Sequence, residues 1–306
     1  MASQLTRRQI LAYLMLCAIW GSTWLAIRVV VRDVPPLEAA AIRFLAASLL
    51  LLGLAGTQKR RWPSTQRQWK AIAALSMTIM AIPYGLLFWA EQYVTSSMTA
   101  VLFSAMPLLV ALFTPLMMHR SVPRRAVFAM VIALGGLLLL FPSGLTTSGR
   151  SLLGGFAILT AVILSSWSVV YAKYRLQEVD AVVSTAMQLL VGSVALFWGS
   201  WALEARSHAL WTRDAVLALS FLVVFGSCVA FVIYYWLLKT MQPYQLSTIS
   251  LITPVVAVLE GALLLREPVP LLMVVAIAIV LGSVATVLLS AAEPERDQSQ
   301  VLLVHE

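Results

Sequence analysis

Ten apolar segments, each close to twenty residues long, fill most of this 306-residue sequence. A helix needs about 20 apolar residues to cross a hydrocarbon core of about 30 Å, so each segment is long enough to span a membrane. The short connections between them contain proline and glycine, which end helices. The expected spans are residues 10–31, 37–56, 71–92, 97–118, 124–142, 151–172, 181–202, 214–238, 244–265 and 269–291. The sequence therefore predicts an all-α polytopic membrane protein with ten transmembrane helices.

The composition excludes most other classes of protein. Apolar residues make up 61% of the chain and charged residues 11%, against about 45–50% and about 25% in ordinary soluble domains. A net charge of +8 would suggest nucleic-acid binding in a soluble protein, but here the basic residues form short clusters beside the apolar segments. We therefore expect the lipid bilayer as a partner, and no nucleic acid. The two cysteines, Cys17 and Cys228, lie inside apolar segments and cannot form a disulfide framework.

The basic residues also indicate how the chain is oriented. If the N-terminus lies in the cytoplasm and ten spans alternate, 14 of the 21 basic residues fall on the cytoplasmic side, six on the outer side and one, Arg43, inside a span. Cytoplasmic loops of membrane proteins carry such an excess. We therefore expect both termini in the cytoplasm and a multi-pass protein of the inner or plasma membrane. The first apolar segment is longer than the core of a signal peptide, so we expect it to be retained.

The sequence partly repeats itself at a shift of 147 residues. The matched pairs include Trp20 with Trp167, Trp89 with Trp236, and Pro107 with Pro254. The shift carries the first five spans onto the last five, and because five is odd, the second half enters the membrane from the opposite side. We predict two inverted five-helix repeats, 1–145 and 146–292, followed by a disordered cytoplasmic tail, 293–306. Many secondary transporters are built this way, with the substrate site between the halves. The alternative is a duplication that only built a stable bundle.

Several short motifs resemble those of the EamA-type permeases of the drug/metabolite transporter superfamily. These motifs are Ala18-Ile-Trp-Gly-Ser-Thr-Trp24, Pro35-Pro36, Ala41-Ile-Arg-Phe44, Thr95–Leu102, Pro107–Leu112, Thr253–Glu260, Arg266-Glu-Pro-Val269 and Gly282. Together they extend over about residues 8–290. The resemblance implies ten helices in two inverted repeats, a central cavity, and export or exchange of small metabolites such as amino acids. One departure is Arg120, which matches the family-like acidic residue Glu267 of the second half.

Two charged residues inside the expected spans are candidates for a gate or for coupling. Arg43 in the second span and Glu260 in the ninth both lie roughly 8 Å from the outer end, at 1.5 Å per residue. Buried charges usually face the bundle interior and find partners. The two could form an outer gate, or Glu260 could bind a proton while Arg43 anchors a substrate carboxylate. The alternatives are a structural ion pair, or an arginine that reaches the outer headgroups. Glu91, which ends the third span, is expected to be solvated.

Aromatic and small polar residues at middle depth are the candidates for a substrate cavity. The expected cavity residues are Trp20, Tyr84, Ser104, Trp167, Tyr171, Gln188 and Thr253. Such a cavity could hold apolar, aromatic or cationic solutes. Alternatively, the polar side chains bond to their own or to neighbouring helices. Aromatic residues expected at the membrane surface are Trp62, Trp69, Trp211 and Tyr244.

Pro107 and Pro254 are expected as hinges. They lie near the middles of the fourth and ninth spans, at equivalent positions of the repeat. Each proline lacks an N–H and clashes with the preceding turn, which kinks the helix and frees a carbonyl. The alternative is a pair of static kinks, because proline is common in membrane helices.

The sequence lacks the usual motifs of enzymes and ATP-driven pumps. It contains no Gly-Lys dipeptide, and hence no Walker lysine motif, and no His-Glu-x-x-His motif. We expect no enzymatic activity, no cofactor and no metal site. The predicted function is secondary active transport, as an exporter or exchanger, of a small-molecule substrate such as an amino acid, by alternating access. The transport could be coupled to protons or to a counter-substrate, or could be facilitated diffusion. A lipid-linked carrier translocase on the same scaffold, a channel and a non-transporting membrane scaffold are the alternatives. The oligomeric state is left open.

Overall fold

The computed structural model describes residues 6–140, 149–204, 208–265 and 271–290, and these contain helices and no strand. The elements are α1 (Arg7–Asp33), α2 (Pro36–Thr57), α3 (Gln66–Leu75), η1 (Ser76–Ala81), α4 (Ile82–Ala90), α5 (Ser96–Phe103), α6 (Met106–Met118), α7 (Arg124–Leu140), α8 (Gly149–Arg175), α9 (Ala181–Leu203), α10 (Arg213–Val223), η2 (Val224–Val229), α11 (Ala230–Thr240), α12 (Pro243–Leu246), α13 (Ile249–Leu265) and α14 (Leu271–Leu289). The two η segments are π-helical.

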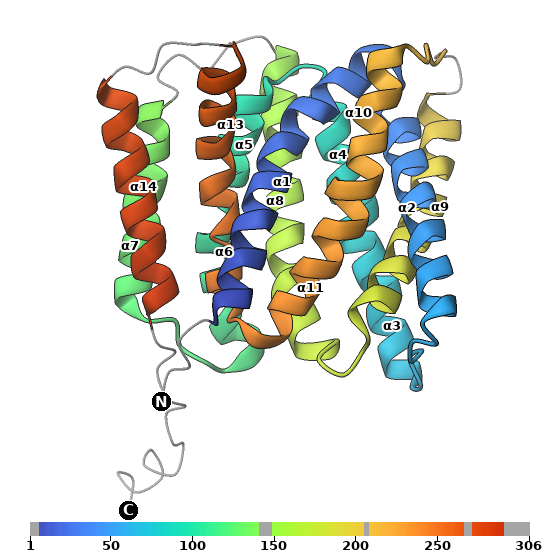
Figure 1. The fold of residues 1–306 in the computed structure, drawn as a ribbon, viewed down its shortest axis with the longest axis horizontal. Coiled ribbons are helices and arrows are strands. Elements are labelled where there is room, and N and C mark those ends of the chain that lie inside the picture. The colour runs from blue at the N-terminus through green and yellow to red at the C-terminus, as the bar shows by residue number, and fades with distance from the viewer. Residues whose placement is uncertain (1–5, 141–148, 205–207, 266–270, 291–306) are drawn as a thin grey trace, which may run out of the picture.

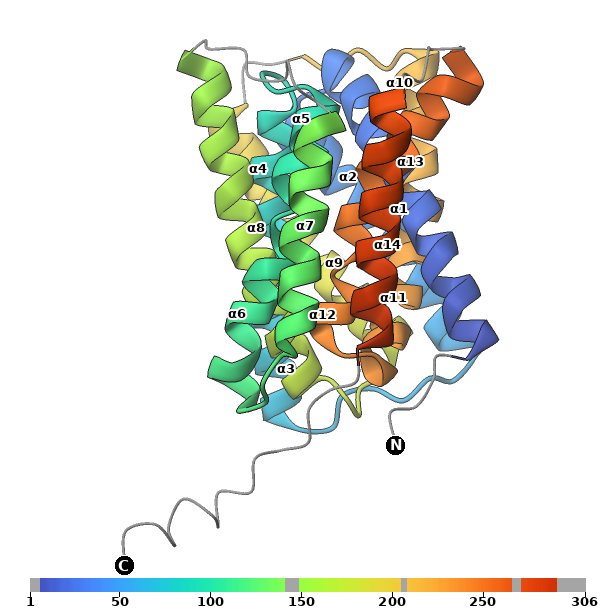
Figure 2. The same cartoon turned by 90° about the vertical axis from the view of Figure 1, so that its left-hand side faces the viewer.

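The helices run side by side to form one bundle (Figures 1 and 2). We call the end at which α1 begins the near end; α14 finishes there too. The far end is the end at which α1 finishes, at Asp33. Within the described residues, eight helical stretches are long and apolar enough to cross a membrane. The other two expected spans correspond to α7 and α13, each of 17 residues. The all-helical structure is therefore consistent with a polytopic membrane protein, and ten crossings stay a prediction.

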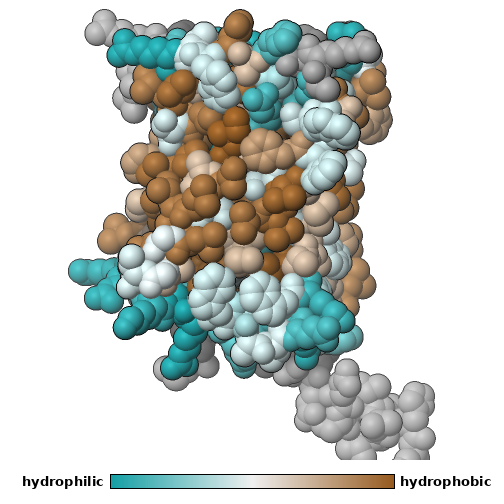
Figure 3. All heavy atoms as spheres, turned by 90° about the vertical axis from the view of Figure 1, so that its right-hand side faces the viewer, coloured by the Kyte–Doolittle hydropathy of each residue, from teal (hydrophilic) through white to brown (hydrophobic). Residues whose placement is uncertain are grey.

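The outer surface suits a lipid environment. On the face shown in Figure 3, an apolar band crosses the middle of the molecule and hydrophilic atoms gather at both ends. Trp62 and Trp69 are exposed toward the near end and Trp211 toward the far end, as expected for surface anchors. Tyr244 differs from expectation. It is buried, because α12 directs its hydroxyl toward the bundle, where it donates to the Ser290 carbonyl (3.3 Å).

Two acidic side chains join α2 and α9 at both of their ends. At the near end, Asp180 accepts from the Val182 N–H (2.9 Å), which caps α9, and pairs with Arg60 (3.1 Å) beyond the end of α2. At the far end, Glu204 follows α9 and accepts from the Leu37 N–H (2.9 Å) in the first turn of α2. A carboxylate at a helix N-terminus satisfies otherwise unpaired N–H groups and interacts favourably with the helix dipole. The α2–α9 pair is therefore fixed at each end.

Contacts between the two halves come in matching sets. α2 packs on α9 and α7 on α14, while α1 packs on α10, α11 and α13, and α8 packs on η1, α4 and α6. The 147-residue shift carries α1 onto α8, α3 onto α10, α4 onto α11 and α6 onto α13. The contacts of α1 with α11 and α13 therefore correspond to those of α8 with α4 and α6, and the α1–α10 contact corresponds to a contact between α8 and α3. The α2–α9 and α7–α14 contacts each correspond to themselves. In Figures 1 and 2, α1 runs from the near end to the far end and α8 runs the opposite way. Both observations agree with the predicted inverted repeat.

The two π-helical segments occupy nearly equivalent places in the two halves. η1 begins at residue 76 and η2 at residue 224, a separation of 148 against the repeat shift of 147. Each interrupts an α-helix, and each packs on the opposite half, η1 on α9 and η2 on α2. Short π-helical turns inside α-helices are frequent at functional sites. Both segments lie beside the interior of the bundle.

Gly192 allows η1 to approach α9 closely. A Cβ at Gly192 would lie 2.8 Å from the Cβ of Met80 and 3.4 Å from the Ser76 carbonyl oxygen. Neither neighbour is the flexible end of a side chain. The contact between α9 and η1 therefore depends on glycine at this position.

We predict that Gly192→Ala lowers the free energy of unfolding by about 1–3 kcal/mol, the usual cost of forcing an extra carbon into a packed interface. Gly53→Ala is the matched control, because a Cβ there would meet no atom within 4 Å. It should be neutral or stabilising, by up to about 1 kcal/mol, because alanine favours helix over glycine. Unfolding of both variants in detergent micelles measures the difference. Equal stability of the two variants would show that the α9–η1 contact is not tight.

Candidate functional site

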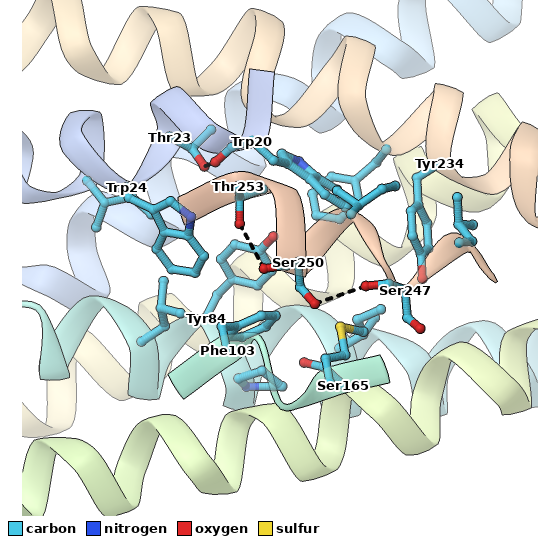
Figure 4. Close-up of a pocket in the computed structure, with 18 residues that line it drawn as sticks. Trp20, Thr23, Trp24, Tyr84, Phe103, Ser165, Tyr234, Ser247, Ser250 and Thr253 are labelled. Carbon is cyan, nitrogen blue, oxygen red and sulfur yellow. Dashed lines mark hydrogen bonds between the residues drawn. The ribbon is translucent and has the colours of Figure 1, made fainter. Parts of the chain in front are cut away.

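A cavity of about 800 Å³, open space at its mouth included, lies between helices of the two halves (Figure 4). The lining side chains come from α1, η1, α4, α5, α6, α8, α11, α12 and α13. Those labelled in Figure 4 are Trp20, Thr23, Trp24, Tyr84, Phe103, Ser165, Tyr234, Ser247, Ser250 and Thr253. None of the lining side chains is charged. The cavity is therefore an uncharged chamber with contributions from both halves.

Aromatic rings form much of the chamber wall. Trp20 of α1 packs against Phe231 and Tyr234 of α11, with ring centroids 5.7 and 5.2 Å apart. Tyr84 of α4 faces Phe231 at 6.0 Å, edge to face. Such spacings are favourable for aromatic pairs. The rings thus hold one another in place and present their free faces to the chamber.

Three hydrogen-bond donors of this wall have no protein partner in the described chain. They are the indole N–H groups of Trp20 and Trp24 and the hydroxyl of Tyr234, and all three are buried. A buried donor without an acceptor costs about 1–3 kcal/mol. A solute or water inside the chamber can supply the acceptors. The wall is therefore suited to a solute that carries hydrogen-bond acceptors beside an apolar body.

The hydroxyl groups of α13 and its preceding turn are bonded locally. Thr253 Oγ1 donates to the Ser250 carbonyl (3.3 Å), and Ser250 Oγ donates to the Ser247 carbonyl (2.9 Å), as Figure 4 shows. Ser104 lies behind this wall and does not line the chamber. Its hydroxyl donates to the same Ser250 carbonyl (2.7 Å) and so ties the fourth span to α13.

The fourth span breaks at Ser104 and Ala105, between α5 and α6. Pro107 consequently lies in the first turn of α6 and not at mid-helix. Its missing N–H has no cost there, because the first N–H groups of a helix have no intrahelical partner. Pro254 lies inside the continuous helix α13. The two prolines matched by the repeat thus have different local structures, and their role as hinges stays a prediction.

Three further expected cavity residues lie outside the chamber. Trp167 and Tyr171 stack on each other along α8, with ring centroids 4.8 Å apart and planes 12° from parallel. Gln188 is buried between α9 and α11, where it donates to Ser184 Oγ (2.8 Å) and accepts from the Tyr235 hydroxyl (2.6 Å).

The structure therefore brings three of the expected cavity residues together at the chamber, namely Trp20, Tyr84 and Thr253. Sequence analysis missed the rings of Phe103 and Phe231, although the shift of 147 residues carries Tyr84 onto Phe231.

Arg43 is buried directly behind the chamber wall. Its Nε donates to Ser227 Oγ (2.8 Å) and its Nη2 to the Gly226 carbonyl (3.0 Å), both in η2. The guanidinium lies 5.2 Å from the ring centroid of Tyr84, at a distance typical of cation–π contact. Arg43 therefore links α2, the π-helical segment η2 and one ring of the chamber.

Arg43 and Glu260 do not pair. The Glu260 carboxylate accepts a hydrogen bond from Ser22 Oγ across the α1–α13 interface. Among the residues that the structure describes, no carboxylate lies within ion-pair distance of Arg43. The two residues share a depth in the membrane, but α2 packs on α9 and η2, whereas α13 packs on α1. Equal depth on two helices that are not neighbours cannot produce an ion pair.

Glu91 is fully buried, contrary to the expectation of a solvated end residue. Its Oε2 accepts from Ser96 Oγ (3.1 Å), and Arg28 of α1 donates to its backbone carbonyl. Nothing in the local sequence signals this burial, because it results from the packing of α8 on α4 and from the contacts of Arg28 of α1 and Ser96 of α5. Within the described residues, no three His, Cys, Asp or Glu side chains gather as a metal site would require.

Membrane-length helices around an aromatic-lined chamber define a multi-pass membrane protein with an internal site of solute size. The sequence model of the EamA-like transporter family matches this chain twice, over residues 7–141 and 152–289. The chain therefore belongs to the EamA-like transporter family, as its sequence motifs indicate, and it is a membrane transporter by that membership. One matched stretch lies in each predicted half.

Curated relatives carry similar descriptions. The uncharacterized transporter YoaV of Bacillus subtilis is 29% identical over 81% of this chain and 86% of its own length. The uncharacterized inner membrane transporter YedA of Escherichia coli is 31% identical over 79% of this chain and 78% of its own. A solved crystal structure shares the fold, with a TM-score of 0.76 and 17% identity, over 93% of this chain and 96% of that chain.

The bond between Arg43 and Ser227 leads to a prediction for stability. Ser227→Ala leaves the buried Nε of Arg43 without an acceptor, so the free energy of unfolding should fall by about 1–3 kcal/mol. Ser220→Ala, on the exposed side of α10, is the matched control and should change it by less than about 0.5 kcal/mol. Thermal unfolding in detergent compares the two. A Ser227→Ala protein as stable as Ser220→Ala would show that Arg43 does not depend on this hydroxyl.

Proposed function

We propose that this protein is a secondary transporter of small metabolites with an apolar or aromatic body, such as amino acids, and that it works by alternating access. The observation that carries the proposal is the chamber between the halves, with its aromatic wall and three unpaired donors. The lining is mostly apolar and aromatic with a few hydroxyl groups, which is typical of small-molecule sites. We place the protein in the inner or plasma membrane, with both termini in the cytoplasm.

The chemistry of the wall favours particular solutes. Aromatic faces pack well against apolar and aromatic groups, and the donors of Trp20, Trp24 and Tyr234 suit the carboxylate or carbonyl oxygens of an amino acid. No basic side chain lines the chamber in the described structure. A lipid-linked diphosphate would leave its charges without a partner there, because phosphate recognition commonly uses arginine or lysine. The wall therefore supports a small metabolite over a lipid carrier.

The matching contacts between the halves support alternating access. In an inverted repeat, exchanging the conformations of the two halves converts a chamber open to one side into a chamber open to the other. Trp20 and Trp24 of α1 line the chamber. Their counterparts in the second half, Trp167 and Tyr171 of α8, stack on each other outside it. This difference between equivalent helices is what a single state of such a cycle requires. Export, exchange and proton coupling are all compatible with this arrangement.

Counterflow in proteoliposomes tests the proposed function. Vesicles containing the purified protein are preloaded with unlabelled L-phenylalanine, L-leucine or L-lysine, and uptake of the matching labelled tracer is followed. We expect saturable counterflow with phenylalanine, weaker counterflow with leucine and none with lysine, whose additional side-chain ammonium gives it a net charge that no carboxylate of the wall would balance. Absence of counterflow with all three, in protein shown to be folded, would contradict the proposed amino-acid specificity. Ion currents too fast for a carrier would indicate a channel.

Two neighbouring tyrosines of α11 provide a matched pair for the substrate site. Tyr234 lines the chamber and its buried hydroxyl has no partner in the described chain, whereas the Tyr235 hydroxyl bonds to Gln188 outside the chamber. Removing a donor used by the substrate loses about 0.5–1.5 kcal/mol, so Tyr234→Phe should raise the KM of phenylalanine counterflow about two- to tenfold. Tyr235→Phe should leave KM unchanged and lower thermal stability. The reverse pattern would show that the solute does not contact Tyr234.

A further inference from the structure

A buried carboxylic acid lies at the far end of the chamber. Glu91 follows the last residue of α4, and none of its surface is exposed. Its Oε2 accepts from Ser96 Oγ, whereas Oε1 is buried without a partner in the described chain. Arg28 donates to the backbone carbonyl of Glu91 and makes no ion pair with its carboxylate. The carboxyl is thus enclosed, close to one positive charge, and only half satisfied.

Few titratable groups surround this carboxyl. α1 contributes Arg28, and α5 contributes, among its described side chains, the hydroxyl groups of Ser96 and Thr99. From α8, Arg150 lies over the ring of Tyr93, 5.7 Å from its centroid.

The packing of α8 on this end is close. A Cβ on Gly154 would lie 2.7 Å from Cγ2 of Val94 and 3.6 Å from the Ala90 carbonyl oxygen. We name Glu91, Arg28, Ser96 and Thr99 the Glu91 cluster.

The Glu91 cluster covers the chamber. Three of its members lie one helical turn from a residue that lines the chamber. Arg28 lies one turn beyond Trp24 on α1, and Glu91 lies one turn beyond Leu87 at the end of α4. Thr99 lies one turn before Phe103 on α5. All three steps lead toward the far end, because α1 and α4 run toward it and α5 runs away from it (Figure 1). The rings of Trp24 and Phe103 face each other at 5.6 Å. An aromatic pair and then the cluster therefore lie between the chamber and the far end, and we call them the far-end seal.

The closed seal favours the neutral acid. Burial raises the pKa of Glu91 to about 8, against the opposing effects of the Ser96 hydrogen bond, the Arg28 charge and the Thr99 hydroxyl. An ionised carboxylate without an ion-pair partner is costly inside a protein. If α1, α4 and α5 separate, water reaches the carboxyl and its pKa falls toward the ordinary value of 4.5.

We propose that the Glu91 carboxyl is a proton-binding site that couples the far-end seal to the proton concentration. The proton is bound while the seal is closed. When the seal opens, the O–H bond breaks, the proton passes to water, and the electron pair stays on the carboxylate. The inference rests on the proposed function, because only a transporter whose far end opens would expose Glu91 in each cycle.

The direction of the pH effect follows from linkage. Between about pH 4.5 and pH 8 the closed form binds more protons than the open form. The closed form is therefore favoured over the open form at low pH, and this preference decreases as the pH rises through the window. Above the window the equilibrium between the two forms no longer depends on the protonation of Glu91.

Infrared difference spectroscopy of the full chain in lipid tests the site without any substrate. Wild-type protein should lose the C=O stretching band of one protonated carboxyl with a midpoint near pH 8. The band should be absent from Glu91→Gln and retained in Glu178→Gln, whose parent side chain is exposed in the turn after α8. Identical titrations of wild type and Glu91→Gln would overturn the proposal.

Transport measurements separate this proposal from the proposed function. With labelled L-phenylalanine as the probe, Glu91→Gln should keep counterflow but lose tracer accumulation driven by a pH gradient, because a neutral amide cannot carry the proton. Glu178→Gln should keep both. If wild type and Glu91→Gln accumulate tracer equally, Glu91 is not the coupling site, although the transporter assignment stands. If wild type shows no counterflow, the phenylalanine assignment fails, and the infrared titration still decides whether Glu91 binds a proton.

A second variant keeps the test valid if Glu91→Gln does not fold. Arg28→Gln retains the acid and removes the nearby positive charge that lowers its pKa. Its infrared midpoint should therefore lie above that of wild type. A midpoint that stays in place or falls would show that the titrating carboxyl is not Glu91.

Discussion

Within the apolar slab every polar group of the backbone must find its partner inside the protein, and the rest of this structure depends on that constraint. Where the chain departs from regular α-helix, side chains supply the missing bonds. At the break between α5 and α6, Ser104 donates to the Ser250 carbonyl of α13. At η2, Arg43 donates to the Gly226 carbonyl. The irregular segments are thus cross-links between helices, and three of the buried donors left unpaired face the chamber.

The sequence predicts the helices well and their interruptions poorly. The span expected at 181–202 agrees with α9, Ala181–Leu203, because length and hydropathy alone define a membrane helix. The span expected at 71–92 consists of the second half of α3, then η1 and α4. Apolar residues are compatible with α- and π-helical turns alike, and η1 forms where Gly192 of α9 permits close approach. That contact joins residues more than a hundred positions apart, which a local pattern cannot reveal.

The chamber residues could be predicted only in part. In a helix that is apolar on all sides, the sequence does not indicate which face points to the interior. Depth in the membrane correctly selects Trp20, Tyr84 and Thr253 as interior residues, but it does not identify the other residues that line the chamber. Repeat symmetry adds Trp167 as the counterpart of Trp20. In the structure α8 contributes Ser165 to the chamber and turns Trp167 toward Tyr171. The sequence repeat predicts two conformations of the transporter, in which the two halves exchange their conformations. A single structure contains only one of these conformations.

The two buried charges beside the chamber are held in different ways, and this difference bears on coupling. Arg43 is surrounded by the hydroxyl of Ser227, the carbonyl of Gly226 and aromatic rings, which stabilise a positive charge, although its Nη1 has no partner in the described chain. A guanidinium stays protonated in proteins, so Arg43 acts as a permanent link between α2 and η2. Glu91 has one unpaired oxygen and no ion pair in the described chain. Of the two, only the carboxyl can change its charge when water enters. Proton binding can therefore be coupled to the opening of the far end through Glu91 and not through Arg43.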